Sequence, residues 1–214
     1  MSIVLSSRLE KALALLPPSL PLIDVGADHG FFSLSASKEG RKVYAVENKV
    51  GPYHTLKENL SEYPRYPVEA ILADGFEVLP SDVRVAALLG MGGKTIEGIL
   101  SAYPEKLSQL DVILIEPQSL FSLPIAYLVK HGYTNDSGEM ILEKRYYPLL
   151  RFVKGKEEAS EAGLKYGSYL VKKKDPLLKE YLLSSIHALA PFEKQAEKKR
   201  AFEEDYKTIY GEKS

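Results

Sequence analysis

The chain has 214 residues, of which 45% are hydrophobic and 27% are charged, and its formal net charge is −1 at pH 7. This composition excludes a disordered chain, and the absence of cysteine excludes disulfides and thiolate metal sites, so no metal site is expected. Because no apolar run reaches the roughly 18 to 20 residues of a membrane span, and the start of the chain lacks the pattern of a signal peptide, we expect a cytoplasmic protein without membrane contact.

The first three quarters of the chain alternates between predicted helices and strands. A first helix is predicted at the capping pattern Ser7-Arg8-Leu9-Glu10 and ends before Pro17-Pro18. The predicted strands are 22–25, 42–46, 68–72, 84–89 and 111–115, and the predicted helices among them are 31–38, 52–60, 95–100 and 123–130. Two further strands, 139–144 and 146–153, follow each other without a helix. This order predicts an α/β fold with a mostly parallel Rossmann-like sheet and an antiparallel edge hairpin, the arrangement of class I methyltransferases.

The composition changes after Gly155, and residues 156–214 carry no strand signal. Asp175-Pro176 is a good N-cap and first-turn pair, and an apolar stripe at helical spacing follows it. Pro191 is expected to interrupt this helix, and a second helix is predicted from Glu193 to Tyr210. We therefore predict a sheet domain over 1–155 and a C-terminal helical domain over 156–214, in which two helices form a coiled-coil-like hairpin.

The loop after the first predicted strand indicates the ligand. In open α/β sheets, a strand, a glycine-flanked loop and a helix present a nucleotide-sized ligand at the carboxyl ends of the strands. Asp28 stands where a pyrophosphate-binding loop has a glycine, and its carboxylate would repel phosphate. The loop therefore favours a cationic ligand without phosphate, such as S-adenosylmethionine. The expected contacts in this loop are Asp24, Gly26, Asp28 and His29.

Acids also end the next two predicted strands. Glu47 follows Gly26 by 21 residues, a spacing at which a carboxylate can accept hydrogen bonds from both ribose hydroxyls. Asp74 can accept a bond from an adenine amino group, and Gly75 lets the ring approach the backbone. The alternatives are a solvated carboxylate at Glu47 and an Asx turn at Asp74.

The fourth predicted strand ends on Gly90-Met91-Gly92-Gly93. In this kind of sheet the position faces the methyl donor, so we expect Gly90 and Met91 to contact the cofactor. The glycines at 92 and 93 would let a flat base approach, and Lys94 would contact an RNA phosphate. The alternative is a flexible turn followed by a solvated lysine. The Asn/Asp-Pro-Pro-aromatic motif of amino-group methylases is absent here, which leaves a ring nitrogen as the candidate acceptor.

These motifs resemble the bacterial TrmK family of tRNA (adenine-22, N1)-methyltransferases. The resemblance rests on Leu5-Ser6 with Arg8-Leu9, on the loop at 24–29, and on the segments 49–53, 73–75, 90–93, 166–167 and 175–177. It covers nearly the whole chain. One segment departs from the family, because Glu116-Pro117-Gln118 stands where the family usually has Gln-Pro-Asn.

The resemblance implies methyl transfer from S-adenosylmethionine to N1 of adenine 22 in tRNA. Asp28 is then the catalytic candidate, because a carboxylate would stabilise the positive charge that develops on the adenine ring. Asp28 alternatively only binds the donor's amino group or caps the next helix. His29 would orient Asp28 or stack on RNA, and Glu116 and Gln118 would contact the target base.

The partner implied by the resemblance is tRNA, and no DNA partner is expected. RNA binding requires cations, and the two lysine-rich triplets of the C-terminal region are the best candidates because the sheet fold does not need them. The full set of candidate cations is Arg8, Lys49, Lys57, Arg65, Lys94, Lys172, Lys173, Lys174, Lys198, Lys199 and Arg200. Each is alternatively a solvated surface charge. The sequence leaves the oligomeric state open and is compatible with a monomer.

Two other functions stay open from the residues alone. The first is methylation of another RNA or of a small molecule on the same scaffold, left open by Glu116 and Gln118. The second is a non-catalytic RNA-binding module that retains the cofactor fold.

Overall fold

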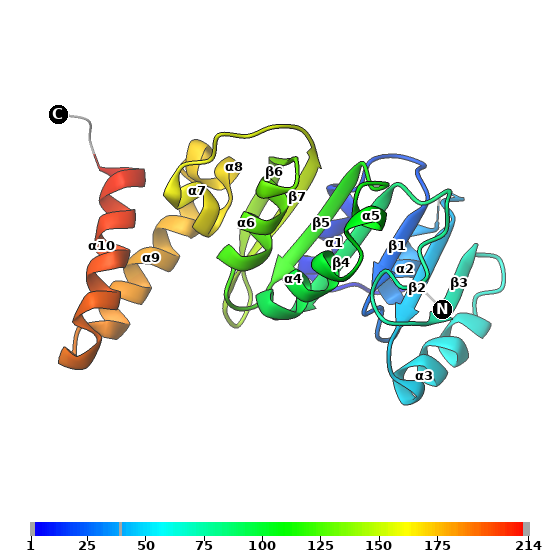
Figure 1. Cartoon of the computed structure of the whole chain (residues 1–214). Helices are drawn as coiled ribbons and strands as arrows, with labels where there is room; N and C mark the ends of the chain where they lie inside the picture. The colour runs from blue at the N-terminus through cyan, green and yellow to red at the C-terminus, as the bar shows by residue number, and fades with distance from the viewer. Residues whose placement is uncertain (1–2, 39, 212–214) are drawn as a thin grey trace.

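The protein is described here by a computed structural model that covers residues 3–38 and 40–211 (Figure 1). The outermost ends of the two predicted domains, residues 1–2 and 212–214, lie outside the described residues. The strands are β1 Leu22–Val25, β2 Val43–Glu47, β3 Val68–Leu72, β4 Val85–Met91, β5 Val112–Pro117, β6 Tyr133–Leu142 and β7 Tyr146–Lys154. The helices are α1 Ser7–Ala14, α2 Phe31–Ala36, α3 Val50–Ser61, α4 Gly93–Ala102, α5 Pro104–Leu107, α6 Ser122–Lys130, α7 Glu161–Tyr166, α8 Ser168–Lys173, α9 Pro176–Leu189 and α10 Ala196–Tyr210, with a short 3₁₀ helix at Glu193–Gln195.

The strands form a single seven-stranded sheet in the order β3-β2-β1-β4-β5-β7-β6. The first five strands in sequence run parallel, whereas β7 is antiparallel to both β5 and β6. The predicted mostly parallel sheet with an antiparallel hairpin is therefore confirmed. Because the strand order reverses between β1 and β4, the segments that follow these two strands diverge, and such a switch point opens a crevice at the carboxyl ends.

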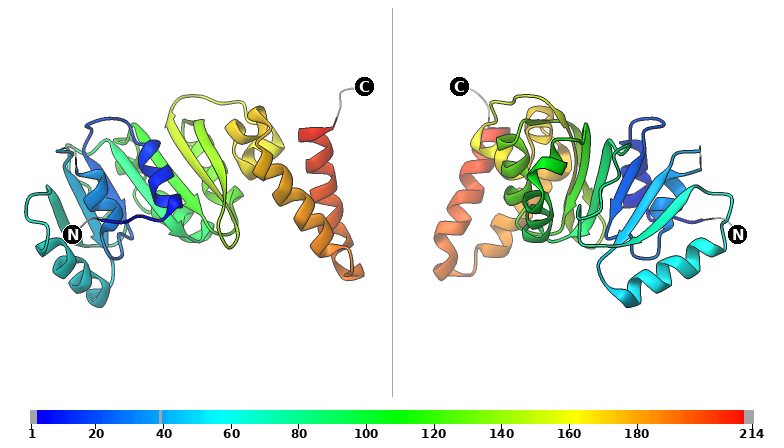
Figure 2. Two further views of the ribbon diagram at one scale, coloured as in Figure 1. Left: turned by 180° about the vertical axis from the view of Figure 1, so that it is seen from behind. Right: turned by 45° about the vertical axis from the view of Figure 1, so that its right-hand side comes forward.

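Helices cover both faces of the sheet. Ala12 of α1 and Phe32 of α2 belong to a buried cluster on one face, and Figure 2 shows α1 in front of that face in its left view. Ile96 of α4 and Leu128 of α6 belong to a larger cluster on the opposite face. Side chains alternate between the faces along each strand, so that Ala87 of β4 packs with the first cluster and its neighbours 86 and 88 with the second. The sheet is thus a buried middle layer.

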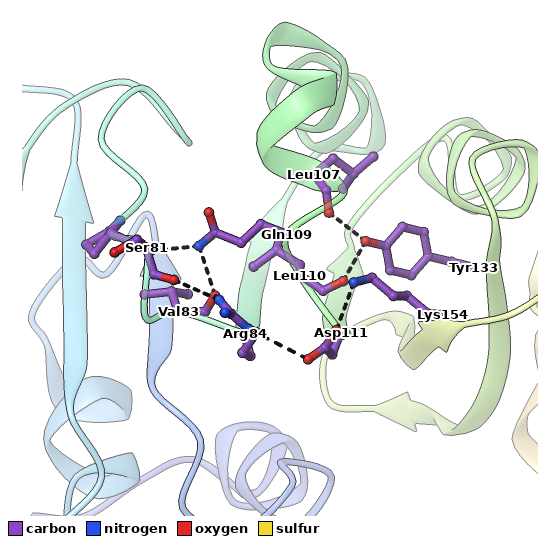
Figure 3. Close-up of polar contacts among 10 residues, drawn as sticks. Ser81, Val83, Arg84, Leu107, Gln109, Leu110, Asp111, Tyr133 and Lys154 are labelled. Atoms are coloured by element: carbon purple, nitrogen blue, oxygen red, sulfur yellow. Dashed lines mark hydrogen bonds and ion pairs between the residues drawn. The ribbon is translucent and has the colours of Figure 1, made fainter.

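Polar contacts fasten the amino ends of the central strands, at the edge opposite the crevice (Figure 3). The Tyr133 hydroxyl donates to the carbonyls of Leu107 and Leu110 at 2.6 and 2.7 Å. Lys154 at the end of β7 pairs with Asp111 at 2.8 Å. Burial raises the pKa of the Tyr133 hydroxyl, which therefore stays protonated and keeps donating. These contacts tie the segments before β5 to the neighbouring ends of β6 and β7.

The C-terminal helices continue the core of the sheet layer. Ala162 of α7 and Leu170 of α8 belong to the same buried cluster as Leu150 and Phe152 of β7. Helices α9 and α10 form a hairpin that stands beyond the β6 edge, at the end of the molecule opposite α3 (Figure 1, Figure 2). The predicted boundary between 155 and 156, and the coiled-coil nature of the hairpin, stay predictions. No helix within residues 3–38 and 40–211 has the length and apolar character needed to cross a membrane.

Local signals predicted most element ends, with three differences. The N-cap of α1 is Ser6, whose hydroxyl accepts from Leu9 N, so the predicted cap at Ser7 was wrong by one residue. β6 begins at Tyr133 instead of 139, because this stretch pairs with β7 despite its polar residues. The three short helices α5, α7 and α8 were not predicted from the sequence. In contrast, Asp175 caps α9 as predicted and accepts from Leu177 N and Leu178 N.

Candidate functional site

The β1 loop has an unusual backbone. Gly26, Asp28 and Gly30 all have positive φ angles, of 73°, 51° and 76°. Glycine adopts this region without strain, and aspartate is among the few other residues that tolerate it. A side chain at Gly30 would also overlap Leu56 of α3. The alternation turns the chain sharply from β1 into α2 and leaves the Asp28 side chain outside the turn.

The crevice at the switch point consists of two adjoining pockets. The first has a volume of about 350 Å³ and is lined by Arg8, Leu9, Asp24, Gly26, Ala27, Asp28, His29, Phe31, Phe32, Leu89, Gly90, Met91 and Gln118. The second has a volume of about 250 Å³ and is lined by Val25, Gly26, Val46, Glu47, Asn48, Lys49, Ala73, Asp74, Gly75, Met91, Thr95 and Ile99. Gly26 and Met91 line both pockets. An elongated ligand could therefore lie across Met91 with one end in each pocket.

Glu47 links the first two loops of the crevice. Its side chain is nearly buried, and its Oε1 accepts from the backbone N–H of Asp28 at 2.6 Å. The other carboxylate oxygen has no protein donor among the described contacts. Because Glu47 lines the second pocket, this oxygen is placed to accept from a ligand hydroxyl. The predicted ribose-binding residue thus lies at the ligand crevice and also supports the loop that carries Asp28.

Asp24 is a buried carboxyl at the base of the first pocket. Its side chain is 3% exposed, and it accepts from the Ser33 hydroxyl at 2.6 Å. Burial raises the pKa of this carboxyl to about 7, the Ser33 hydrogen bond opposes the increase, and the nearby Glu47 charge adds to it. A cationic ligand in the pocket would favour the ionised form. Asp24 is therefore suited to respond to a positive charge.

Asp28 and His29 lie at the rim of the same pocket. The Asp28 side chain is 79% exposed, and its Oδ1 lies 3.9 Å from Nε2 of His29. The His29 ring stacks on Phe31 with ring centres 5.9 Å apart, and its backbone carbonyl accepts from Asn59. The Asp28 carboxylate is thus free to face a ligand, while His29 is positioned by its neighbours.

Asp74 and Gly75 border the second pocket. Asp74 is exposed and accepts a long hydrogen bond, of 3.5 Å, from the Asn48 amide. Gly75 has a φ of 55°, and a Cβ there would come within 2.8 Å of the Ile99 side chain. The glycine is therefore required by packing against α4, in addition to any approach by a ligand ring.

Three residues from different elements meet at the mouth of the first pocket. A Cβ at Gly90 would lie 3.6 Å from the Arg8 guanidinium and 3.7 Å from the Gln118 amide. Gly90 has a φ of 76° at the register shift near the end of β4, so this position favours glycine for backbone reasons as well. The mouth therefore combines the hydrogen-bonding side chains of Arg8 and Gln118 with the uncovered backbone of Gly90.

Glu116 does not reach that mouth. Its side chain is completely buried and forms an ion pair with Arg8, and its Oε1 has no partner. Burial raises the pKa of the Glu116 carboxyl, and the Arg8 charge opposes the increase. The departure from the family motif at 116 is thus compensated within the protein by Arg8. Contact of Glu116 with a substrate would have to act through Arg8, whereas Gln118 lines the pocket directly.

The glycines at 92 and 93 face the protein. A Cβ at Gly93 would overlap the backbone carbonyls of Ser119 and Leu120, and a Cβ at Gly92 would lie 3.3 Å from the Ser119 hydroxyl. Gly93 N donates to the Ser119 carbonyl at 2.8 Å. Their absent side chains let the loop after β5 pack onto the start of α4, and neither glycine lines the crevice pockets.

The predicted RNA-binding cations do not form one surface. Lys94, Lys172, Lys173, Lys174 and Arg200 are exposed, Lys172 pairs with Glu157 at 3.4 Å, and Lys199 pairs with Glu203 at 3.5 Å. Lys198 instead lines a larger cavity between the sheet and the C-terminal helices, where Gln118 is also found. Arg8 lies at the crevice. The structure thus brings Arg8 and Gln118 to the mouth and separates the two triplets.

Several crevice residues were not predicted from the sequence. Asn48, Thr95 and Ile99 line the second pocket, and Phe31 lines the first. Asn48 had a local signal, because it follows Glu47 directly at a strand end. The positions of Thr95 and Ile99 depend on how α4 packs against β4, β5 and the loop after β3, which no local pattern indicates. The described residues contain no cluster of three or more His, Asp or Glu that could hold a metal ion.

The arrangement fits S-adenosylmethionine. Acids from three strand ends surround two pockets that meet at Met91, and the carboxylates are suited to a sulfonium, an ammonium and ribose hydroxyls. A phosphate would meet the Asp28 carboxylate at the position where glycine backbone normally binds it.

Comparison with known proteins agrees with this geometry. A sequence profile of TrmK, tRNA (adenine(22)-N(1))-methyltransferase, matches residues 22–210. The tRNA (adenine(22)-N(1))-methyltransferase of Bacillus subtilis (strain 168) is 25% identical over 203 residues, which cover 88% of this chain and 84% of that protein. The structure of Streptococcus pneumoniae Sp1610 in complex with S-adenosyl-L-methionine has a TM-score of 0.84 at 22% identity, covering 96% of this chain and 98% of that chain. M. capricolum TrmK in complex with S-adenosyl-homocysteine has a TM-score of 0.80 at 22% identity, covering 96% of each chain.

The buried Asp24 predicts a pH dependence of stability. Its pKa is about 7 in the folded protein and about 4 in an unfolded chain, so the folded state binds more protons between these values. The free energy of unfolding should therefore fall as pH rises from about 4 to about 7. Asp24→Asn lacks this titration, so its stability relative to the wild type should increase across the same window. Urea unfolding of both proteins at pH 5 and pH 7.5 measures this difference, and parallel pH profiles would contradict the assignment.

Proposed function

The chain belongs to the TrmK family of tRNA (adenine(22)-N(1))-methyltransferases, as its motifs predicted, and from this premise we propose how its own residues bind the donor and the substrate. The reaction is methylation of N1 of adenine 22 in tRNA, with S-adenosylmethionine as the donor. The observation that carries the proposal is the crevice at the switch point, where Asp24, Asp28 and Glu47 surround one continuous site next to Gln118. No feature of this kind among the described residues favours another substrate.

Glu47 and Asp74 would hold the nucleoside part of the donor. The free oxygen of Glu47 would accept from the ribose hydroxyls, and Asp74 with Gly75 would border the adenine. Asp24 and the β1 loop at Gly26 would face the amino acid part, and Gly90 and Met91 would pack against the donor from β4. S-adenosylmethionine supplies a methyl group activated by its sulfonium.

Arg8 and Gln118 would hold the target base at the mouth of the first pocket. The Gln118 amide both donates and accepts, so it can match the edge of an adenine. Arg8 cannot repel the forming cation strongly, because the buried Glu116 carboxylate pairs with it. Arg8 would therefore act through hydrogen bonding and stacking on RNA.

Asp28 would act on the charge of the methylated base. Adenine N1 has a lone pair and carries no proton, so methyl transfer requires no general base. The ring gains positive charge as the bond forms, and an exposed carboxylate at the rim of the pocket would stabilise it. His29 would help to orient Asp28, since its Nε2 lies 3.9 Å from the carboxylate. The rest of the rate enhancement would come from alignment of the donor's methyl group with N1 of the adenine.

The identity of the product is tested in cells. Mass spectrometry of tRNA from a strain lacking this protein should show loss of 1-methyladenosine at position 22, restored by the wild-type gene. Loss of a different modified nucleotide would support another RNA as substrate. An unchanged modification profile would support a non-catalytic role, and either result would overturn the proposal.

The role of Glu47 is tested by donor binding. Glu47→Ala should weaken the affinity for S-adenosylmethionine by about tenfold or more, because it removes charge-assisted hydrogen bonds to the ribose. Glu62→Ala, which removes an exposed carboxylate at the end of α3, is the matched control and should bind normally. Isothermal titration calorimetry measures both affinities. Wild-type affinity of the Glu47 variant would remove the ribose assignment.

The role of Asp28 is tested by separating chemistry from binding. Asp28→Asn keeps the shape of the side chain but removes its charge, so the single-turnover rate should fall by about 100-fold. Binding of tRNA, measured on filters, should change by about threefold or less, because one rim carboxylate contributes little to RNA affinity. An unchanged rate, or a loss of tRNA affinity as large as the loss of rate, would retire Asp28 as a catalytic residue.

A further inference from the structure

A second cavity lies between the sheet and the C-terminal helices, next to the donor crevice. Its volume is about 700 Å³, within the range of ligand-binding sites. It is formed by the loop after β5, the turn between β6 and β7, and helices α7, α9 and α10. Gln118 lines both this cavity and the first crevice pocket, so the two spaces adjoin at that residue.

Aromatic rings form one side of the cavity. The Tyr181 ring lies 5.9 Å from Phe121, 5.7 Å from Tyr146, 6.2 Å from Tyr166 and 6.0 Å from Phe202, measured between ring centres. These contacts hold α9 and α10 against the sheet layer. Tyr166 is buried, whereas the other four rings are half-buried and line the cavity with part of their surface. They therefore offer faces on which a base can stack, in addition to their packing role.

The charges around the cavity are positive. Lys144 and Arg145 of the β6–β7 turn and Lys198 of α10 are exposed, and none of them forms an ion pair within the part of the chain that the structure describes. Lys165 also lines the cavity, but Glu161 and Asp205 hold it at 2.9 and 3.0 Å. The lining contains no aspartate or glutamate among residues 3–38 and 40–211. Aromatic faces with unpaired cations suit a nucleotide, whose base stacks and whose phosphate is anionic.

Leu120 follows Gln118 by two residues and lines the cavity, but it lines neither crevice pocket. Its side chain is 60% exposed, although leucine is apolar, and its φ is 47°, a left-handed conformation that is strained for a bulky residue. The packing of Ser119 and Leu120 against Gly93 holds the backbone in this conformation. The loop after β5 thus holds an exposed apolar side chain in the cavity lining, two residues along the chain from Gln118, where the two spaces adjoin.

We propose that this cavity binds a second nucleotide of the tRNA, one that adjoins adenine 22, and that Leu120 inserts between the two as a wedge. The proposal rests on the proposed function, because a base must leave its stack to reach the donor crevice and its neighbour loses a stacking partner. The rings of Tyr146, Phe121 and Phe202 replace that partner, and Lys144 and Arg145 bind the phosphate. An apolar wedge keeps the stack open, as in proteins that insert such side chains between base steps.

Binding measurements test the cation part of the cavity. The double variant Lys144→Ala/Arg145→Ala should weaken binding of a full-length tRNA transcript by about tenfold, and reduce the slope of log Kd against log salt by about one to two. Its S-adenosylmethionine affinity should stay within about twofold, because neither residue lines the donor crevice. The matched control is Lys38→Ala/Lys130→Ala, which removes the same charge from exposed positions near the ends of α2 and α6 that were not candidates for RNA binding. Equal losses in both double variants would overturn the proposal.

Single-turnover kinetics test the wedge. Leu120→Ala should lower the methylation rate by about tenfold or more while tRNA affinity stays within about threefold, and Leu120→Met should restore most of the rate because it keeps an apolar side chain. A normal rate in Leu120→Ala, or a rate in Leu120→Met as low as that of Leu120→Ala, would overturn the wedge.

Cross-linking locates the second nucleotide. Transcripts that carry 4-thiouridine at position 21 or 23 should cross-link under ultraviolet light to peptides containing Phe121, Tyr146 or Phe202, and adducts found only elsewhere would overturn the proposal.

The tests of the cavity and the test of the methylation reaction can fail independently. If the wild type methylates adenine 22 but the cavity variants match the control, only this inference fails. If the wild type methylates nothing, the proposed function fails, while filter binding and cross-linking still decide whether the cavity holds RNA.

Discussion

The reversal of strand order between β1 and β4 is the constraint on which the whole site depends. These two strands are parallel neighbours, but the chain leaves them toward opposite edges of the sheet, so their following loops cannot close over each other. The crevice left between them has Met91 at its centre and the acidic ends of β1 and β2 on one side. The bond from Asp28 N to Glu47 then ties two of these loops together. Glu47, which lines the second pocket, therefore also fixes the loop that carries Asp28.

The acceptor side depends on a different set of contacts, made by the loop after β5. This loop packs onto α4 only because Gly93 has no side chain, and the packing holds Leu120 in a left-handed conformation with its side chain exposed in the lining of the larger cavity. Below the loop, Arg8 neutralises the buried Glu116. Removing one partner of such a pair generally costs about 3 to 5 kcal/mol, because it leaves a buried charge unpaired. The ion pair between Arg8 and Glu116 thus links α1 to β5, and it holds Arg8 at the mouth of the first pocket.

The sheet, and the meeting of several acids at one edge of it, could be predicted from the sequence because their signals are local. Alternating strands and helices specify the sheet, and acids at strand ends necessarily meet at one edge of it. The surroundings of the predicted substrate-binding residues could not be predicted, since they depend on long-range packing. No local pattern indicates that Arg8 pairs with Glu116, or that the loop after β5 packs onto the glycines at 92 and 93. The aromatic cluster around Tyr181 combines rings from five elements, so no single window of sequence indicates it.

The crevice and the larger cavity adjoin at Gln118. We propose that the donor lies across Met91, with its nucleoside at Glu47 and its amino acid end toward Asp24. A crystal structure of this protein with S-adenosylhomocysteine tests this claim most directly. We predict ribose hydroxyls within hydrogen-bonding distance of Glu47, adenine beside Gly75, and the sulfur facing the mouth at Gly90 and Gln118. A ligand bound in the reverse direction, or bound outside this crevice, would contradict the account.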